Sequence, residues 1–473
     1  MKNIYSFLYL LGLFFAQPTP THSVGFFKKT SIESQIKKVI HETDPHINIG
    51  IKIIDLDKDQ VLFEQNGERY FYPASLTKIL TCLAALKKLG AAYQFQTNLY
   101  RQGADWYVEF GADPTLTLNN LRDLFHAIKS HISTGKIEGN LYVVQRSKAN
   151  LPLLIDGWTL GSSQFCFGAP VSSIIINTNG LRFNLVSEDK KSTQVSFASD
   201  QISYPISNKT YVGSCTDLTK IERHHLSLGE TLNLEGCVSE KILPLKMCLP
   251  IGTENFKTYV EKNIKLALEK EGLHLFGKLI FAQERSAKAV LVNSWASDYL
   301  IDILIKGMKE SDNLVLNAIL LAVLEDHPTP LRKWDDAGKQ LAKILEEELH
   351  SDLSGANLTD GAGLSYLNLI SPSQILQLLV NGLSDKAISE DFLRTLAVPG
   401  EEGTLKGRLN DIKGVKIIAK TGALTSVSGL AGFVLKNNKP KFAFVIMING
   451  VAGGLSKYNK LEENIVRILS DHS

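Results

Sequence analysis

The sequence lacks most of the signatures that identify metal-binding or nucleic-acid-binding proteins. It contains no C-x-x-C pair and no H-E-x-x-H motif, so nothing predicts a zinc site, and we expect no metal and no cofactor. Charge of one sign is not in excess, because 51 basic and 49 acidic residues give a formal net charge of +2. A chain so nearly balanced gives no electrostatic reason to expect nucleic acid as a partner.

Long apolar runs are absent after the N-terminus. The one marked run, from Ile4 to Ala16, follows Lys2 and precedes the polar stretch QPTPTHS. At about 1.5 Å per residue it is too short to cross a hydrocarbon core of roughly 30 Å. This pattern is typical of a secretory signal peptide, with an uncleaved anchor as the alternative. We therefore expect residues 1–23 to be a signal peptide of undefined cleavage point, and the mature protein to be exported, periplasmic and without a membrane span.

Cysteine is scarce, with 5 residues in a chain of 473. An exported protein can form disulfides, and an odd number of cysteines leaves at least one thiol free. Cys215, Cys237 and Cys248 lie close together in the sequence, which makes a bridge among them plausible. The sequence does not choose the pairing among these three and Cys166. Cys82 lies within an apolar helix and is interpreted as a small buried residue.

Patterns of apolar residues divide the chain into three parts. Residues 24–90 predict a helix, a β-hairpin and a second helix, whereas residues 91–288 contain many short β-type runs separated by glycine, asparagine and aspartate. Residues 289–473 predict helices, then the strands VKIIAKTGAL, GLAGFVLK and KFAFVIMING, and a closing helix. The hairpin and these strands together predict an α+β domain with a five-stranded antiparallel sheet flanked by helices. Residues 91–288 would be a β-rich insertion, made of two small subdomains.

The stretch FYPASLTKIL places Ser75 and Lys78 three positions apart at the start of an apolar helix. Residues at this spacing lie on the same side of a helix, so the amine can approach the hydroxyl. A serine needs an adjacent base to become a nucleophile, and a lysine becomes that base when burial lowers its pKa. The alternative is an ordinary helix start with a solvated lysine. The same S-x-x-K spacing recurs at Ser34, Ser133 and Ser187, but those serines lie in polar surroundings.

Two further motifs offer groups that suit a substrate. Ser311-Asp312-Asn313 supplies a hydroxyl and an amide, although serine, aspartate and asparagine are also common helix N-caps. Lys420-Thr421-Gly422 follows an apolar run that predicts a strand, so its side chains would lie at a strand end. Gly422 would let a substrate backbone lie close to that strand.

S-x-x-K, S-D-N and K-T-G in this order resemble the active-site serine penicillin-recognising enzymes. The chain is most similar to the D-alanyl-D-alanine carboxypeptidase/endopeptidase family of penicillin-binding protein 4, the low-molecular-mass class C penicillin-binding proteins. The long interval between Ser75 and Ser311 fits that family, in which extra domains separate the first two motifs, and argues against a compact β-lactamase. The resemblance also rests on GADPTL, GAPVSSIIINTNG, TDGAGLS, PGEEGTLKGRL and AKTGALTSVSGLAGF.

The resemblance implies a transpeptidase-like catalytic domain formed by residues 24–90 and 289–473, and a role for each motif residue. Ser75 would be acylated by the penultimate D-Ala carbonyl, Lys78 would be its base, and Ser311 would pass a proton to the leaving amine. Substrate would be bound by Asn313, Lys420, Thr421 and Gly422, and the oxyanion hole would be formed by the backbone N–H groups of Ser75 and Ala423.

The implied enzyme is a serine DD-peptidase that cleaves D-Ala-D-Ala termini, D-Ala cross-links or both in peptidoglycan stem peptides, and that β-lactam antibiotics inhibit. The alternatives are a non-catalytic scaffold and a β-lactamase or esterase on the same fold. Relatives carry hydroxyl residues where this chain has Ala362 and Ala423, and an acidic residue near Asn317. These departures concern substrate preference and rate, and the sequence does not define the oligomeric state.

Overall fold

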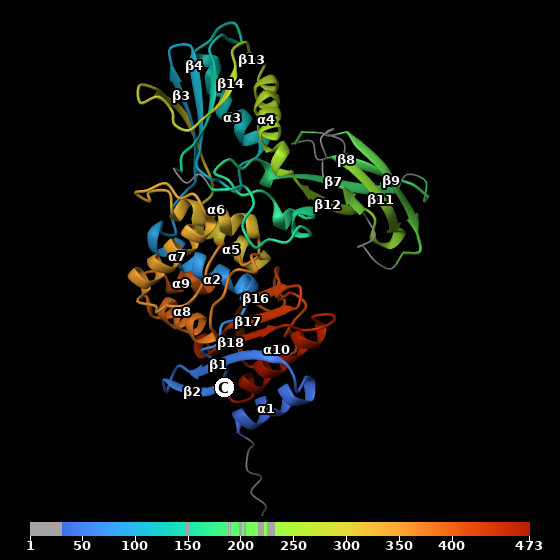
Figure 1. Ribbon diagram of the computed structural model, residues 1–473, viewed down its shortest axis with the longest axis vertical. Coiled ribbons are helices and arrows are strands. Elements are labelled where there is room, and N and C mark those ends of the chain that lie inside the picture. Colours follow the sequence, from blue (N-terminus) through green and yellow to red (C-terminus); the bar gives the residue numbers. More distant parts are fainter. Residues whose placement is uncertain are drawn as a thin grey trace, which may run out of the picture.

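The computed structural model describes residues 31–147, 151–187, 191–197, 205–215, 222–224 and 232–473, together with residues 189, 201 and 202. The proposed signal peptide, residues 1–23, lies outside these ranges. Within them no helix is long and apolar enough to cross a membrane. The molecule is elongated, with a sheet at one end, a layer of helices in the middle, and an α/β part with a lateral β arm at the other end (Figure 1).

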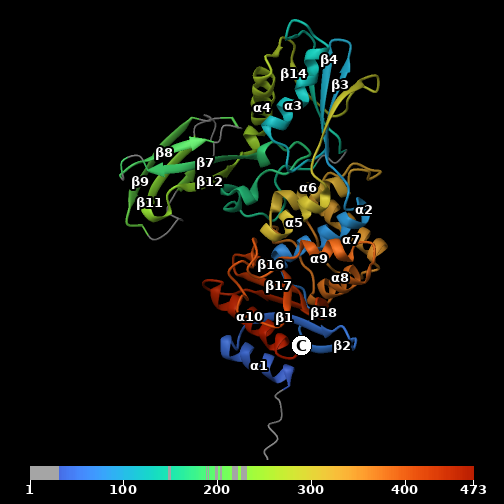
Figure 2. The same ribbon diagram turned by 180° about the vertical axis from the view of Figure 1, so that it is seen from behind.

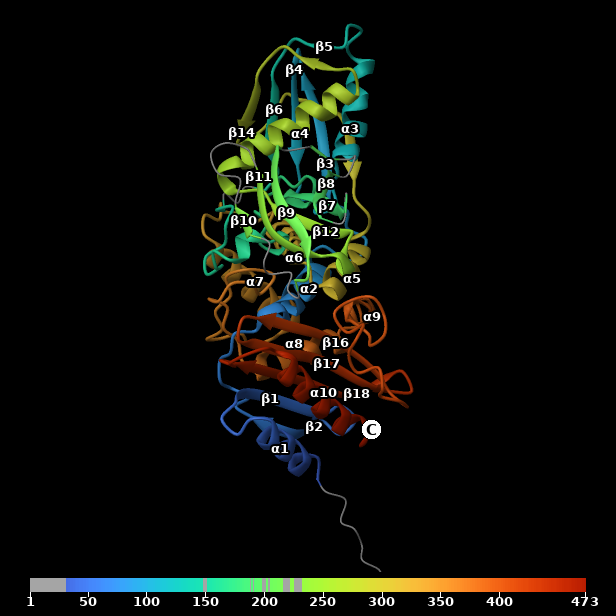
Figure 3. The ribbon, with the colours of Figure 1, turned by 90° about the vertical axis from the view of Figure 1, so that its right-hand side faces the viewer.

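The predicted five-stranded antiparallel sheet is confirmed. Its strand order is β16-β17-β18-β1-β2, and every neighbouring pair is antiparallel. Seen from the side, β16 lies nearest to the helical layer and β2 farthest from it (Figure 3). The strands are β1 (Asn48–Asp55), β2 (Gln60–Gln65), β16 (Lys416–Leu424), β17 (Val427–Lys436) and β18 (Lys439–Asn449).

Side chains along each strand point alternately to the two faces of the sheet. Both faces are buried, because each of them packs in a core with helices. On β18, Phe442, Phe444 and Ile446 pack in one core with α1 (Ile32–Thr43) and α10 (Ser456–Ser470). Ala443 and Val445 belong to the second core, on the opposite face. That core includes the helices α2 (Thr77–Lys88), α5 (Leu300–Glu310), α6 (Asn313–Val323), α7 (Trp334–Leu349), α8 (Pro372–Ser384) and α9 (Ser389–Thr395).

Helix α2 is the central element of the helical layer. Its residues from Thr77 to Leu86 are all buried, Lys78 included. A helix that is apolar on nearly all sides can only be stable inside a core. The fold around α2 therefore places Lys78 where its ammonium loses water, and this burial decides the chemistry described below.

The chain between α2 and α5 forms two further β structures. One is the sheet β14-β6-β4-β3-β15, packed against α3 (Leu118–His126) and α4 (Phe256–Lys270). Its strands are β3 (Gln96–Gln102), β4 (Asp105–Phe110), β6 (Leu141–Gln145), β14 (Leu279–Ala282) and β15 (Val290–Ala296), with β5 (Lys136–Ile137) paired to β13 (His274–Leu275).

The other β structure is the lateral arm, which projects to one side in both face-on views (Figure 2). It contains the sheets β12-β7-β8 and β10-β11-β9. The strands are β7 (Gly180–Ser187), β8 (Thr193–Phe197), β9 (Ile206–Gly213), β10 (Glu222–His224), β11 (Leu232–Ser239) and β12 (Leu245–Pro250). The division of the insertion into two small subdomains stays a proposal.

One boundary of the insertion needs correction. Residues from 289 onward were assigned to the catalytic domain, but β15 pairs with β3 over Val290–Ala296. We therefore propose that the insertion ends after Ala296, and that the second part of the catalytic domain begins with the segment leading into α5. The periodicity of β15 alone could not indicate which sheet it joins.

Two disulfides lie in this region. Cys215 is bonded to Cys237, one of the pairs left open among the three neighbouring cysteines, and Cys166 is bonded to Cys248. Cys82 is a free thiol and is fully buried. Burial raises the pKa of the Cys82 thiol to about 12, so it stays protonated and unreactive, which agrees with its interpretation as a core residue.

Candidate active site

Ser75 lies in η1 (Ala74–Leu76), a short 3-10 turn that leads directly into α2. Pro73 precedes the turn and Ala74 has a left-handed φ of 48°, so the chain bends sharply before the helix begins. The Thr77 hydroxyl donates to the Ala74 carbonyl at 3.0 Å and holds the bend. This geometry leaves Ser75 partly exposed while Lys78, one turn later, is 0% exposed.

The amine of Lys78 is surrounded by three oxygen atoms. Its Nζ lies 2.9 Å from Ser75 Oγ, 2.6 Å from Asn313 Oδ1 and 2.7 Å from the Ala362 carbonyl. An ammonium donates to all three, whereas a neutral amine donates to two and accepts a proton from the third. Since the amide and carbonyl oxygens have no proton to give, Ser75 is the only one of the three that can supply it.

The pKa of Lys78 fits this exchange. Burial lowers it from 10.5 to about 7, against the opposing charges of Asp360 and Asp312. At neutral pH a substantial share of the molecules therefore holds a neutral amine beside the serine hydroxyl. The predicted pairing of Ser75 with a base of lowered pKa has the geometry that nucleophilic catalysis needs.

The S-D-N motif joins α5 to α6. Ser311 ends α5 in a left-handed conformation with a φ of 60°, and Asp312 caps α6 by accepting from the Val315 N–H at 3.0 Å. The cap alternative is therefore correct for Asp312, while its neighbours Ser311 and Asn313 are turned toward the two lysines. Asn313 also donates to the Phe167 carbonyl at 3.0 Å, which leaves one hydrogen of its amide for a substrate.

The K-T-G motif lies on β16, across from Ser311. Lys420 is 0% exposed, and its Nζ donates to Ser311 Oγ and to the Thr421 carbonyl, each at 2.9 Å. Burial, and then the nearby charge of Lys78, hold the pKa of Lys420 well below 10.5. The three motifs therefore meet in one place, with each lysine hydrogen-bonded to one serine hydroxyl.

Gly422 is needed for a reason that the sequence did not reveal. A Cβ atom at this position would lie 2.9 Å from the Pro73 carbonyl oxygen and 3.4 Å from the Ala74 side chain. The close neighbour is therefore the turn that carries Ser75, and this packing is a second reason for glycine here, beside the approach of a substrate backbone to the strand, which stays a prediction. Because β16 packs so closely on η1, the next residue, Ala423, follows beside the nucleophile segment.

Sequence analysis missed Asp360, which organises the loop beside Lys78. Its carboxylate is fully buried and accepts from the side chains of Trp158 and Asn368 at 3.0 and 2.9 Å. It also accepts from four consecutive backbone N–H groups, those of residues 362 to 365. The signal was the D-G step in TDGAGLS, because aspartate often binds backbone N–H groups in glycine-containing turns.

Two of the departures from relatives lie at this loop. Ala362 contacts Lys78 through its backbone carbonyl, so this contact requires no particular side chain. Asn317 accepts from the Gly361 N–H at 2.8 Å, and its buried amide nitrogen has no partner among the described residues. Among all the residues that the structure describes, no group of three or more His, Cys, Asp or Glu side chains could hold a metal ion.

Comparisons with known proteins point to one family. The model of the D-Ala-D-Ala carboxypeptidase 3 (S13) family matches residues 32–471. The D-alanyl-D-alanine carboxypeptidase DacB of Haemophilus influenzae is 26% identical, over 96% of this chain and 95% of that protein. The crystal structure of penicillin-binding protein 4 from the same organism aligns with a TM-score of 0.79 and 25% identity, over 92% of this chain and 99% of that one. A second structure of that protein, complexed with a novel β-lactam, aligns with a TM-score of 0.74 and 24% identity over the same shares.

Proposed function

Because the chain belongs to the D-Ala-D-Ala carboxypeptidase 3 (S13) family of peptidases, we propose that it works as a serine DD-peptidase through an acyl-enzyme on Ser75. The observation that carries the assignment of roles is the position of Lys78, a buried amine 2.9 Å from Ser75 Oγ. A scaffold that only recognised wall peptides would have no need of a base with a lowered pKa at that place.

The reaction follows from the contacts of the two lysines. Neutral Lys78 takes the proton of Ser75 while Oγ attacks the carbonyl of the penultimate D-Ala, and the backbone N–H groups of Ser75 and Ala423 stabilise the oxyanion. When the C–N bond breaks, the proton held by Lys78 is relayed through Ser311 to the leaving amine, which returns Lys78 to its neutral form. Water then attacks the acyl ester while neutral Lys78 takes a proton from it. That proton returns to Ser75 Oγ as the ester bond breaks, and the peptide leaves with a new carboxylate.

The substrate would be held along β16 and α6. One amide hydrogen of Asn313 has no partner among the residues that the structure describes, and it can donate to a peptide carbonyl of the substrate. Lys420, whose amine donates to Ser311, and Thr421, the next residue on β16, would anchor the terminal carboxylate. Peptidoglycan stem peptides ending in D-Ala-D-Ala carry both groups, and β-lactam antibiotics carry an acylating carbonyl with a nearby carboxylate.

We place the enzyme outside the cytoplasm, in the periplasm. Two observations support this location: the predicted signal peptide, and two disulfides, which persist in oxidising compartments and are rare in the cytosol.

The test is to incubate the purified protein with a labelled penicillin and to map the adduct by mass spectrometry. We expect the label on Ser75, and a Ser75→Ala variant that folds normally but neither binds the label nor releases D-Ala. Label on another residue, or D-Ala release by the variant, would refute the mechanism. A stable adduct supports the peptidase, whereas rapid hydrolysis of the adduct would favour the β-lactamase alternative.

A second measurement separates the two peptidase activities. Cross-linked and uncross-linked muropeptides are digested side by side, and the products are resolved by chromatography. Loss of terminal D-Ala from the uncross-linked peptides would identify a carboxypeptidase, and conversion of dimers to monomers an endopeptidase. Activity on neither would contradict the assignment to peptidoglycan stem peptides.

A further inference from the structure

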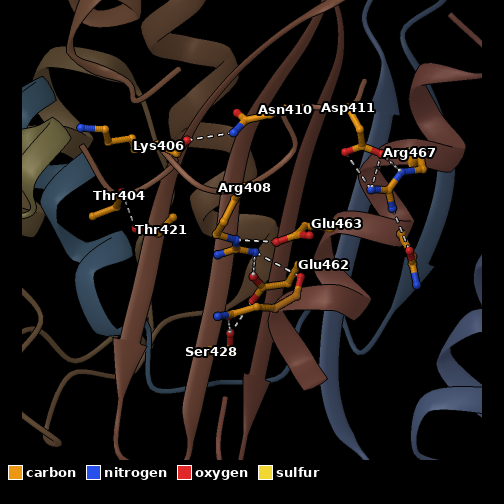
Figure 4. Close-up of polar contacts among 12 residues, drawn as sticks. Thr404, Lys406, Arg408, Asn410, Asp411, Thr421, Ser428, Glu462, Glu463 and Arg467 are labelled. Carbon is orange, nitrogen blue, oxygen red and sulfur yellow. Dashed lines mark hydrogen bonds and ion pairs between the residues drawn. The ribbon is translucent and has the colours of Figure 1, made fainter. Parts of the chain in front are cut away.

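The segment 399–412, which contains PGEEGTLKGRL, connects α9 to β16 and reaches the active site at Thr404. The hydroxyl of Thr421 donates to Thr404 Oγ1 at 2.8 Å (Figure 4). Both threonines are partly exposed. The K-T-G motif is therefore extended by a hydroxyl from a fourth segment of the chain.

One side of this segment is fixed to the end of α5. The Thr404 N–H donates to the Lys309 carbonyl at 3.0 Å, two residues before Ser311, and the Lys309 amine pairs with Glu401 at 3.0 Å. Gly403 has a φ of 129°, and a Cβ atom there would lie 2.8 Å from the same carbonyl. Only glycine allows this approach, so the G-T step places Thr404 against the end of α5 as well as beside Thr421.

The other side is fixed to α10, which packs on β17. Arg408 donates to Glu463 at 2.7 Å and to Glu462 at 2.9 Å, as Figure 4 shows. Glu462 is fully buried and also accepts from the Ser428 hydroxyl at 2.6 Å. Attachment at both sides holds Thr404 in position before any substrate arrives, which is the condition for a preorganised binding group.

The direction of the hydrogen bond between the two threonines shows that the bond uses the hydroxyl hydrogen of Thr421 and not that of Thr404. A hydroxyl has one hydrogen, and Thr421 uses its own on Thr404. The hydrogen of Thr404 meets no acceptor in the part of the chain that the structure describes. A hydroxyl that accepts one hydrogen bond becomes a stronger donor of its own hydrogen. Ala423, the residue after Gly422 on β16, has no hydroxyl. Thr404 can therefore supply the hydroxyl donor that this position of β16 lacks.

We propose that Thr404 determines specificity for the terminal carboxylate of the substrate, by donating its hydroxyl hydrogen to that carboxylate while Thr421 orients it. The proposal rests on the proposed function and adds to it a binding group outside the three motifs. The ligand chemistry is an anionic carboxylate, of a D-Ala terminus or of a penicillin. An uncharged ester in the same place would gain much less from this donor.

The test compares acylation by benzylpenicillin with acylation by its methyl ester, using rate constants measured by mass spectrometry of the Ser75 adduct. Thr404→Val keeps the shape and removes the hydroxyl, Thr404→Ser restores it, and Thr425→Val removes an exposed hydroxyl from the neighbouring turn. We expect Thr404→Val to slow acylation by the acid about tenfold to a hundredfold, the range for a lost hydrogen bond to a charge. The ester should change by less than about twofold, and the serine variant should recover most of the rate.

The outcomes separate this inference from the function on which it rests. If the parent enzyme forms the Ser75 adduct and Thr404→Val slows both reagents equally, Thr404 only supports the fold and the inference is wrong. An unchanged acid rate in Thr404→Val, or an equal loss in Thr425→Val, would overturn it too. Failure of the parent enzyme to label Ser75 with either reagent would overturn the proposed function itself. Thermal unfolding of each variant confirms that the rates belong to folded protein.

Discussion

Substitutions at two adjacent residues, Asp312 and Asn313, should shift the pH dependence of acylation in opposite directions. The general base must be neutral, so the rate should rise with pH through the pKa of Lys78 and level off above it. That pKa is lowered from 10.5 to about 7. One unit corresponds to about 1.4 kcal/mol, so the surroundings as a whole, burial less the opposing charges of Asp360 and Asp312, disfavour the ammonium by about 5 kcal/mol.

Asn313→Asp places a negative charge at the oxygen that now lies 2.6 Å from Lys78 Nζ. At an effective dielectric constant of about 20, opposite charges at that distance attract by about 6 kcal/mol. This attraction is as large as that net penalty, so the pKa of Lys78 should rise toward its ordinary value. We expect the rising limb of the rate profile to move up by at least about 2 pH units.

Asp312→Asn is the matched control, because asparagine caps a helix as well as aspartate does. The charge of Asp312 raises the pKa of Lys78, so its removal should move the limb slightly below 7. The assay is the rate constant for acylation by a fluorescent penicillin between about pH 5 and pH 10, which covers the rising limb and the plateau of each profile. A parent profile that is flat below pH 8, or two variants that shift in the same direction, would refute the role of Lys78.

Three further predictions concern the surroundings of the site. Asp360→Asn should destabilise the protein by about 3–5 kcal/mol in denaturant unfolding, since buried donors lose their acceptor, while the exposed Asp326→Asn should change little. Gly422→Ala should slow acylation about tenfold or more, because β16 must then move away from the turn that carries Ser75. Gly454 faces open space, so Gly454→Ala should leave the acylation rate unchanged, and equal rates for the two variants would contradict the packing argument. Burial raises the pKa of Glu462 from 4.5 to about 6, so its contribution to the stability of the fold is present below pH 4.5 and is lost as pH rises through 6. Relative to Glu462→Gln, the free energy of unfolding of the parent should fall by about 2 kcal/mol between these two pH values. A difference between the two proteins that does not change with pH would show that the pKa shift is absent.

Much of the catalytic domain was predictable because its signals are local. The strands of the five-stranded sheet alternate or run apolar with clear turn residues between them, and α2 is apolar on all sides. The order of S-x-x-K, S-D-N and K-T-G predicted the nucleophile, its base and the residues around them. Asp360 was missed although the D-G step of TDGAGLS is a local signal for its contacts with the backbone N–H groups of residues 362 to 365. Thr404 could not be found in this way, because it acts through a contact with a distant segment, and nothing in the neighbouring sequence indicates that contact.

The sequence by itself determined which residue types were available, which helix would be buried, and that the three motifs lie far apart along the chain. Only the tertiary structure decided that Lys78 loses its water, because burial is produced by α6 and the loop at Asp360 as much as by α2 itself. The fold likewise decided which cysteines are bonded, that Gly422 faces the turn of Ser75, and that Thr404 meets Thr421. The physical reason is the same in each case: a pKa, a bond or a close approach depends on the neighbours in space, and these come from segments that only folding brings together.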